Sequence, residues 1–169
     1  DSQEFVVYSD GENDPIFSHP WNSLGNDLPM GTDGEYAFYY PGEYDAGVEI
    51  TFEIINTSHP ALGQDLIFEN TTTGQLLRVK NEYMSQIISG YEGFAQGDII
   101  TMTSGLGKIG LTLRRNNVDY NIANAVDILY EHPVITPGMN IFNVLIDKTI
   151  EPDDEWTVKF RSNVLRGGL

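Results

Sequence analysis

The sequence predicts an all-β fold, an antiparallel β-sandwich, and two observations lead to that prediction. Short segments in which apolar and polar residues alternate recur along the chain, which is the period of a half-buried strand. Turn-forming residues, chiefly Gly, Pro and Asn, separate these segments at regular intervals. Helix is expected only near Tyr83–Ile88 and Ala123–Leu129, for a turn or two each.

Residues 1–34 precede the regular part of the chain. They contain a strand-like segment, Glu4–Tyr8, followed by Asp-Gly, Asp-Pro, His-Pro and Leu-Pro steps, which favour turns and extended backbone. We therefore predict a long irregular N-terminal arm whose loops wrap against the domain. Residues 35–169 are predicted to form the sandwich.

Several of the predicted strands of the sandwich alternate apolar and polar residues, as Val48–Ile54 does with one dry and one wet face. The predicted strands are Tyr36–Tyr40, Val48–Ile54, Asp65–Glu69, Gln75–Val79, Asp98–Thr103, Ile109–Arg114, Val118–Ile122, Asn140–Leu145 and Trp156–Phe160. Pro41-Gly42 ends the first of them, as a natural turn pair. Gly74 and Asn116-Asn117 tolerate the positive φ that tight hairpins need.

One stretch, Gly105–Gly110 (GLGKIG), matches the G-x-G-x-x-G pattern of phosphate-binding loops. That pattern binds phosphate only where it opens a helix. Here Ile109, Leu111 and Leu113 alternate downstream, so a strand follows instead. We interpret Ser104–Gly107 as a β-turn between two antiparallel strands.

Composition restricts the partners. The 169 residues include 25 acidic and 9 basic ones, a net charge of −16, which argues against nucleic acid and anionic membrane. Cysteine is absent, so disulfides and thiolate chemistry are excluded. No apolar run approaches the ~20 residues of a membrane span, and no signal peptide is visible. The chain begins at Asp1, and we expect it to be a piece of a longer protein.

Metal and catalytic motifs are weak. His19, His59 and His132 each precede a proline, which is typical of loop corners, and they are too far apart in sequence for a zinc motif. The acidic alternation around residues 10–14 resembles a calcium loop, but Trp21 occupies the position of the bidentate glutamate. In so acidic a chain a carboxylate pair is uninformative. We therefore predict no metal site, no cofactor and no enzymatic activity.

Aromatic residues are the more suggestive feature. Rings on a sandwich can stack on sugars or dock a protein, although strand alternation buries about half of them. Core packing and binding both remain open for the set, from which we select Trp21, Tyr36 and Tyr44 as candidate contacts. The whole set is Trp21, Tyr36, Phe38, Tyr39, Tyr40 and Tyr44.

Six segments in a fixed order resemble a known family, the C-terminal galectin-like domain of the distal tail proteins of siphophages that infect Gram-positive bacteria. Each segment is a turn joined to alternating apolar residues, and together they cover residues 35–166. The segments are Tyr40–Ile50, Leu66–Gly74, Gly97–Thr103, Ile109–Leu113, Pro137–Phe142 and Trp156–Arg161. The arm at residues 1–34 fits this pattern only loosely.

The resemblance implies a galectin-like, jelly-roll-like sandwich located in the virion, at the tail tip or baseplate. Its partners would be other phage tail proteins: tail-tube, tip, receptor-binding or baseplate components. In that family an N-terminal half forms a homo-hexameric ring, so we expect this chain to be the C-terminal half alone. The family carries no active site.

Two functions are therefore weighed. The first is a structural phage protein that acts by protein–protein contact. The alternative is a carbohydrate-binding module that recognises host cell-wall saccharide through exposed aromatics such as Trp21 and Tyr44. A glycosidase is a third hypothesis and would need two carboxyl groups ~5 to 10 Å apart in a cleft.

Overall fold

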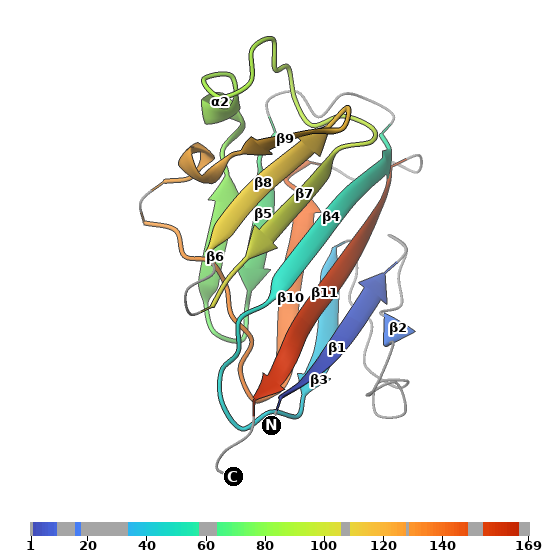
Figure 1. The fold of residues 1–169 in the computed structure, drawn as a ribbon, viewed down its shortest axis with the longest axis vertical. Helices are drawn as coiled ribbons and strands as arrows, with labels where there is room; N and C mark the ends of the chain where they lie inside the picture. Colours follow the sequence, from blue (N-terminus) through green and yellow to red (C-terminus); the bar gives the residue numbers. More distant parts are fainter. Residues whose placement is uncertain are drawn as a thin grey trace.

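The structure is a computed structural model that describes residues 2–9, 16–17, 34–57, 64–105, 109–127, 129–148 and 154–165. For residues 2–9, 16–17 and 163–165 only the backbone is described. Figure 1 shows two layers of strands with a short helical region at one end.

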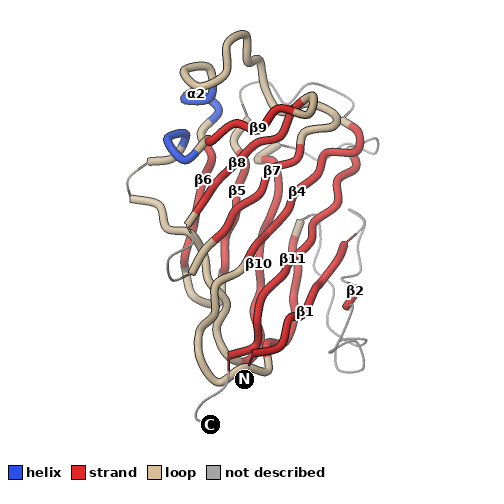
Figure 2. Tube along the Cα trace, in the orientation of Figure 1, coloured by secondary structure: helices blue, strands red, loops and turns tan. Residues whose placement is uncertain are grey.

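Within these ranges the chain forms strands almost throughout (Figure 2). The elements are β1 (Ser2–Ser9), β2 (Ile16–Phe17), β3 (Glu35–Tyr40), β4 (Glu49–Asn56), β5 (Leu66–Asn70), β6 (Gln75–Val79), α2 (Asn81–Met84), β7 (Ile99–Thr103), β8 (Gly110–Arg115), β9 (Val118–Asn121), the 3-10 turn η1 (Ala123–Ala125), β10 (Gly138–Ile146) and β11 (Glu155–Leu165).

The strands make two antiparallel sheets. The large sheet has seven strands in the order β2-β1-β11-β4-β7-β8-β9, and the small sheet has four in the order β3-β10-β5-β6. The pairs β5–β6, β7–β8 and β8–β9 are hairpins. The last strand, β11, instead lies between β1 and β4 and pairs with both, although they are far from it in the sequence. The predicted antiparallel β-sandwich is confirmed.

The core lies between the sheets and is rich in aromatic rings. Phe38 of β3 and Phe142 of β10 stack at 5.8 Å between ring centroids, and both contact Phe160 of β11. Phe52 of β4 packs on Trp156 at 5.4 Å. All of these rings are almost fully buried. Aromatic burial of this extent is a main source of the stability of a chain that has no disulfide.

The helical segments are shorter than expected. The first is a single turn, Asn81–Met84, and begins two residues before the predicted Tyr83; the second is only the turn Ala123–Ala125. Both follow a strand of one sheet and precede a strand of the other, and Lys80 N–H donates to the carbonyl of Ala125 to join them. The segment between β6 and β7 therefore forms a packed cap at the end of the sandwich.

The N-terminal strand lies inside the large sheet. The predicted segment Glu4–Tyr8 is part of β1, which pairs antiparallel with β11 from Ser2↔Leu165 to Ser9↔Val158. Apart from β1, β2 and Gly34, residues 1–34 lie outside the described residues, so the predicted arm stays a prediction.

The G-x-G-x-x-G stretch connects strands. β7 ends at Thr103 and β8 begins at Gly110, antiparallel to it. No helix opens after the glycines, as the alternation predicted. The central residues 106–108, and with them most of the expected β-turn, lie outside the described residues.

No helix in the described part of the chain is long and apolar enough to cross a bilayer.

Candidate functional site

The three aromatic residues selected from the sequence, Trp21, Tyr36 and Tyr44, differ in where the structure places them. Tyr36 is 2% exposed, and its ring packs edge-to-face against Phe160 with centroids 5.7 Å apart, so it belongs to the core and offers no ring face to a partner. Tyr44 is 57% exposed, on the loop between β3 and β4. Trp21 lies outside the described residues.

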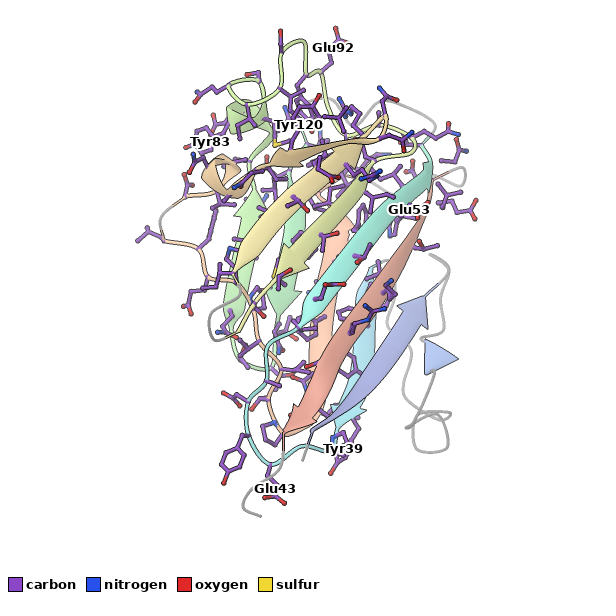
Figure 3. The ribbon with its side chains drawn as sticks, viewed as in Figure 1. Tyr39, Glu43, Glu53, Tyr83, Glu92 and Tyr120 are labelled. Carbon is purple, nitrogen blue, oxygen red and sulfur yellow. The ribbon has the colours of Figure 1, made fainter. Side chains whose placement is uncertain are left out.

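Tyr39 is an exposed aromatic residue that the selection missed. On β3 the residues Tyr36, Phe38 and Tyr40 point into the core, and the two-residue period turns Tyr39 outward, where it is 48% exposed. The alternation was the signal that could have found it, because it assigns the two tyrosines Tyr36 and Tyr39 to opposite faces. Figure 3 shows Tyr39 and Glu43 at the same end of the sandwich, opposite the end that carries Glu92.

Tyr39 belongs to a larger surface, the outer face of the small sheet. This face consists of the side chains that alternate with the buried ones on each strand. They are Glu35, Ala37 and Tyr39 on β3, Met139, Ile141, Asn143 and Leu145 on β10, Ile67 and Glu69 on β5, and Leu76 and Arg78 on β6. Most are apolar: Tyr39 and Met139 are each more than a third exposed, Ala37 is buried, and the other apolar side chains are partly buried.

Strand register arranges this face in rows. Tyr39 opposes Met139, and Ala37 opposes Ile141, so one part of the face is apolar. The other apolar part begins where Leu145 opposes Ile67.

A polar row lies between these two apolar parts. Asn143 opposes Glu35 on one side and Glu69 on the other. The Asn143 Nδ2 amide donates to Glu69 Oε1 at 3.1 Å, which fixes the position of that carboxylate.

The outer face of the large sheet has a different chemistry. On β4 the outward positions are Glu49, Thr51 and Glu53, and on β11 they include Thr157 and Lys159. Such a mixture of charged and hydroxyl side chains is typical of a sheet face in contact with water. Among the described side chains, those on the outer face of the small sheet have the more apolar character, which is typical of a contact surface.

Most of the described basic side chains are held in ion pairs. Arg78 pairs with Asp65 and Asp147 at 3.2 and 2.9 Å, and these contacts raise its pKa. Lys148 Nζ lies 2.5 Å from the buried Asp154. These cations are therefore committed within the chain.

An ion pair with a buried carboxylate ties the cap to the large sheet. Arg115 donates through Nε and Nη2 to the two carboxylate oxygens of Asp98, at 2.8 and 2.6 Å, and Nη2 also donates to Gly93. The guanidinium lies 5.0 Å from the Tyr91 ring centroid, and Asp98 is only 1% exposed. Burial raises the pKa of Tyr91, so its hydroxyl stays neutral. The arrangement ties Asp98 and Gly93 to Arg115, and it pairs the charges of Asp98 and Arg115 with each other.

A second buried polar network joins two of the motifs that are far apart in the sequence. Asn70 Nδ2 donates to Asn140 Oδ1 at 3.0 Å and to the carbonyl of Val134 at 2.8 Å. Asn140 in turn donates to the carbonyls of Thr136 and Gly138. These amides satisfy turn backbone groups, so they stabilise the fold rather than form a binding site.

His132 is the one predicted loop-corner histidine that the described residues include. Its Nδ1 lies 3.0 Å from the Thr103 carbonyl oxygen, and burial lowers its pKa. No group of three or more metal-ligating side chains comes together among the residues with described side chains. His19, His59, Asp10, Glu12 and Asp14 lie outside them.

Comparison with known proteins gives little. No family model matches the sequence, and no curated protein matches it. One solved structure, a crystal structure of a mutant of HCR/D, aligns with a TM-score of 0.38 and 11% identity over 96% of this chain. The chain spans about half of that protein, 48% of its length.

Proposed function

We propose that this chain is a non-enzymatic structural domain of a phage virion, the C-terminal galectin-like domain of a siphophage distal tail protein. In this proposal it lies at the tail tip or baseplate and serves as a docking surface for tail-tube, tip, receptor-binding or baseplate components. The observation that carries the docking role is the largely apolar, partly exposed outer face of the small sheet, on which Tyr39 and Met139 are the most exposed apolar side chains.

The positions of three of the segments that carry the family resemblance also support the proposal. Pro41-Gly42 follows β3, Asn70–Gly74 turns β5 into β6, and Pro137-Gly138 leads into β10. The network around Asn140 joins the second and third of these segments through Asn70 and Gly138, so these two act together in the sandwich scaffold. A scaffold of this kind serves an assembly by holding a surface rigid.

The buried polar groups of the described region favour docking over catalysis. Asp98, Asn70 and Asn140 are each hydrogen-bonded to groups of the scaffold. A general acid or base needs instead a carboxyl or imidazole group that reaches a substrate. We therefore assign the chain no catalytic role.

Cryo-electron microscopy of intact tails tests the location. We expect density for the sandwich at the tail tip, attached outside a ring formed by the full-length parent, and a hexameric mass for that parent in gel filtration. A parent protein absent from the tail tip would overturn the assignment.

The alternative function, a module that binds host cell-wall saccharide, is favoured by a specific observation. Tyr39 and Tyr44 are both exposed, and Glu43 and Asp45 flank Tyr44 in the sequence. An exposed ring beside carboxylates can stack on a sugar and accept hydrogen bonds from its hydroxyls.

Binding of the purified chain to host cell walls and to isolated wall polysaccharide separates the two functions. Saturable binding that is lost in Tyr39→Ala or Tyr44→Ala would establish the saccharide site. Val118→Ala, at an exposed position on β9, is the control. Equal retention of wild type and variants would exclude these rings as a sugar site.

A further inference from the structure

We infer that the outer face of the small sheet binds a partner protein whose contact surface carries Lys or Arg side chains between apolar ones. The inference rests on the proposed docking function and specifies the partner's chemistry. It follows from the row that contains Glu35, Asn143 and Glu69, which lies between two apolar parts of the face.

The carboxylates of this row have no cation of their own among the described residues. The described ion pairs involve neither Glu35 nor Glu69. Arg78, which β6 contributes to the same face, is engaged by Asp65 and Asp147. The face therefore combines apolar side chains with negative charge that no described neighbour neutralises.

Covering this face imposes a requirement on the occupant. An occupant that contacts the apolar parts on both sides would also cover the row between them and so remove Glu35 and Glu69 from water. A desolvated carboxylate is costly unless a cation and hydrogen-bond donors replace the water. An occupant that buries the apolar rows must therefore place positive charge against the middle row.

The chain cannot supply that charge from its N-terminal segment. The first basic residue in the sequence is Arg78, so residues 1–77 contain no Lys or Arg. A second copy of the chain would add another net charge of −16. Like charges brought together at an interface oppose association, so the charge complementarity selects a different, basic partner.

The test uses two synthetic peptides that share their four leucines and differ at the alternate positions, which are basic in Leu-Lys-Leu-Arg-Leu-Lys-Leu and acidic or neutral in Leu-Glu-Leu-Gln-Leu-Glu-Leu. Binding to the whole chain is measured by fluorescence anisotropy, and the contact is mapped by NMR shifts of backbone and Asn143 side-chain amides. We expect the basic peptide to bind, to shift the Asn143 amide signals, and to weaken as salt is added.

Matched variants identify the charges responsible. The double variant Glu35→Gln, Glu69→Gln should weaken the basic peptide at least about tenfold, which corresponds to about 1.4 kcal/mol. The control Glu49→Gln, Glu53→Gln removes the same charge from the outer face of the large sheet and should change the affinity by less than about twofold. Thermal melts of all variants check that they fold.

Several outcomes overturn the inference. They are equal binding of both peptides, equal weakening by both double variants, shifts that map to the large sheet, or no binding of either peptide at millimolar concentration. The result is separable from the proposed function, because tail-tip location is decided by imaging. Basic-peptide binding by a protein absent from tails would sustain this surface and reject the phage role.

Discussion

Asp98 shows how a single acidic residue can be buried in a chain of high negative charge. Its two carboxylate oxygens accept hydrogen bonds from Arg115 and from the backbone N–H of Ala95. Each of the two carboxylate oxygens therefore has at least one donor, and the Tyr91 ring lies against the Arg115 guanidinium. The burial is stable because charge and hydrogen bonds are satisfied together.

We predict that Asp98→Asn lowers the free energy of unfolding by about 3 kcal/mol, since it leaves the Arg115 guanidinium largely buried without its counter-charge. The control is Asp119→Asn. Asp119 of β9 pairs with Arg114, which precedes Arg115 on β8. Both of these side chains are exposed, so the expected loss is about 0.5 kcal/mol or less. Urea denaturation of both variants checks the difference, and equal losses would contradict it.

His132 gives a prediction about pH. Because its folded pKa lies below the ordinary value, its contribution to stability is complete above a pH of about 6.5 and is lost as the pH falls through the folded pKa. We expect His132→Gln to lose less stability than wild type between a pH of about 7.5 and 5.5.

The measurement is the free energy of unfolding against pH. The reference protein carries His19→Gln and His59→Gln, so that His132 is its only histidine. Parallel pH profiles for the reference and its His132→Gln derivative would show that His132 does not contribute.

At the scale of the element, the hairpin between β8 and β9 is set by its two turn residues. Asn116 and Asn117 have φ values of 52° and 63°, and Arg115 opposes Val118 across them. Two consecutive residues with positive φ match the twist of the flanking strands. Asparagine tolerates this conformation better than other residues with a Cβ atom.

We predict that Asn117→Val destabilises the protein by about 1–2 kcal/mol, because a β-branched side chain is strained at positive φ. Asn117→Gly is the matched control and should leave the melting temperature unchanged or raise it. Calorimetry of the two variants decides. A valine variant as stable as the glycine one would contradict the assigned turn.

The small sheet shows how strand alternation separates packing from binding. On β3 it places Tyr36 in the core and Tyr39 on the surface, because residues an odd number of positions apart on a strand point to opposite faces. On β10 it buries Phe142 and leaves Ile141 on the outer face. The inner face of each strand therefore packs in the core and the outer face carries the proposed contact surface, so a substitution can address either face alone.

At the scale of the whole molecule, the net charge of −16 is the dominant electrostatic fact. Because most described cations are in ion pairs, the remaining carboxylates repel one another and any partner of like sign. This field favours the basic partner inferred for the outer face of the small sheet.

We predict that sodium chloride stabilises the protein. Between about 0.01 and 0.1 M salt the Debye length falls from about 30 to about 10 Å, which screens the long-range repulsion. The free energy of unfolding should rise over this range. Sucrose at the same osmolality is the control for non-ionic effects. A stability that falls with added salt would mean that the ion pairs outweigh the repulsion.

The sequence by itself determined the fold class, the strands and the chemistry of the turns, because these depend on local periodicity and on residues such as Asn117 and Gly74 whose conformational freedom is intrinsic. It also determined that Tyr36 and Tyr39 lie on opposite faces, but not which face is inside. That choice required the second sheet.

Only the tertiary structure decided how the parts combine. The partnership of β1 with β11, of Asp98 with Arg115, and the row of Glu35, Asn143 and Glu69 all join residues from separate strands. Alternation fixes the direction of a side chain along one strand but carries no information on the register between strands. The candidate surface is therefore a product of register, which depends on the packing of the whole sandwich.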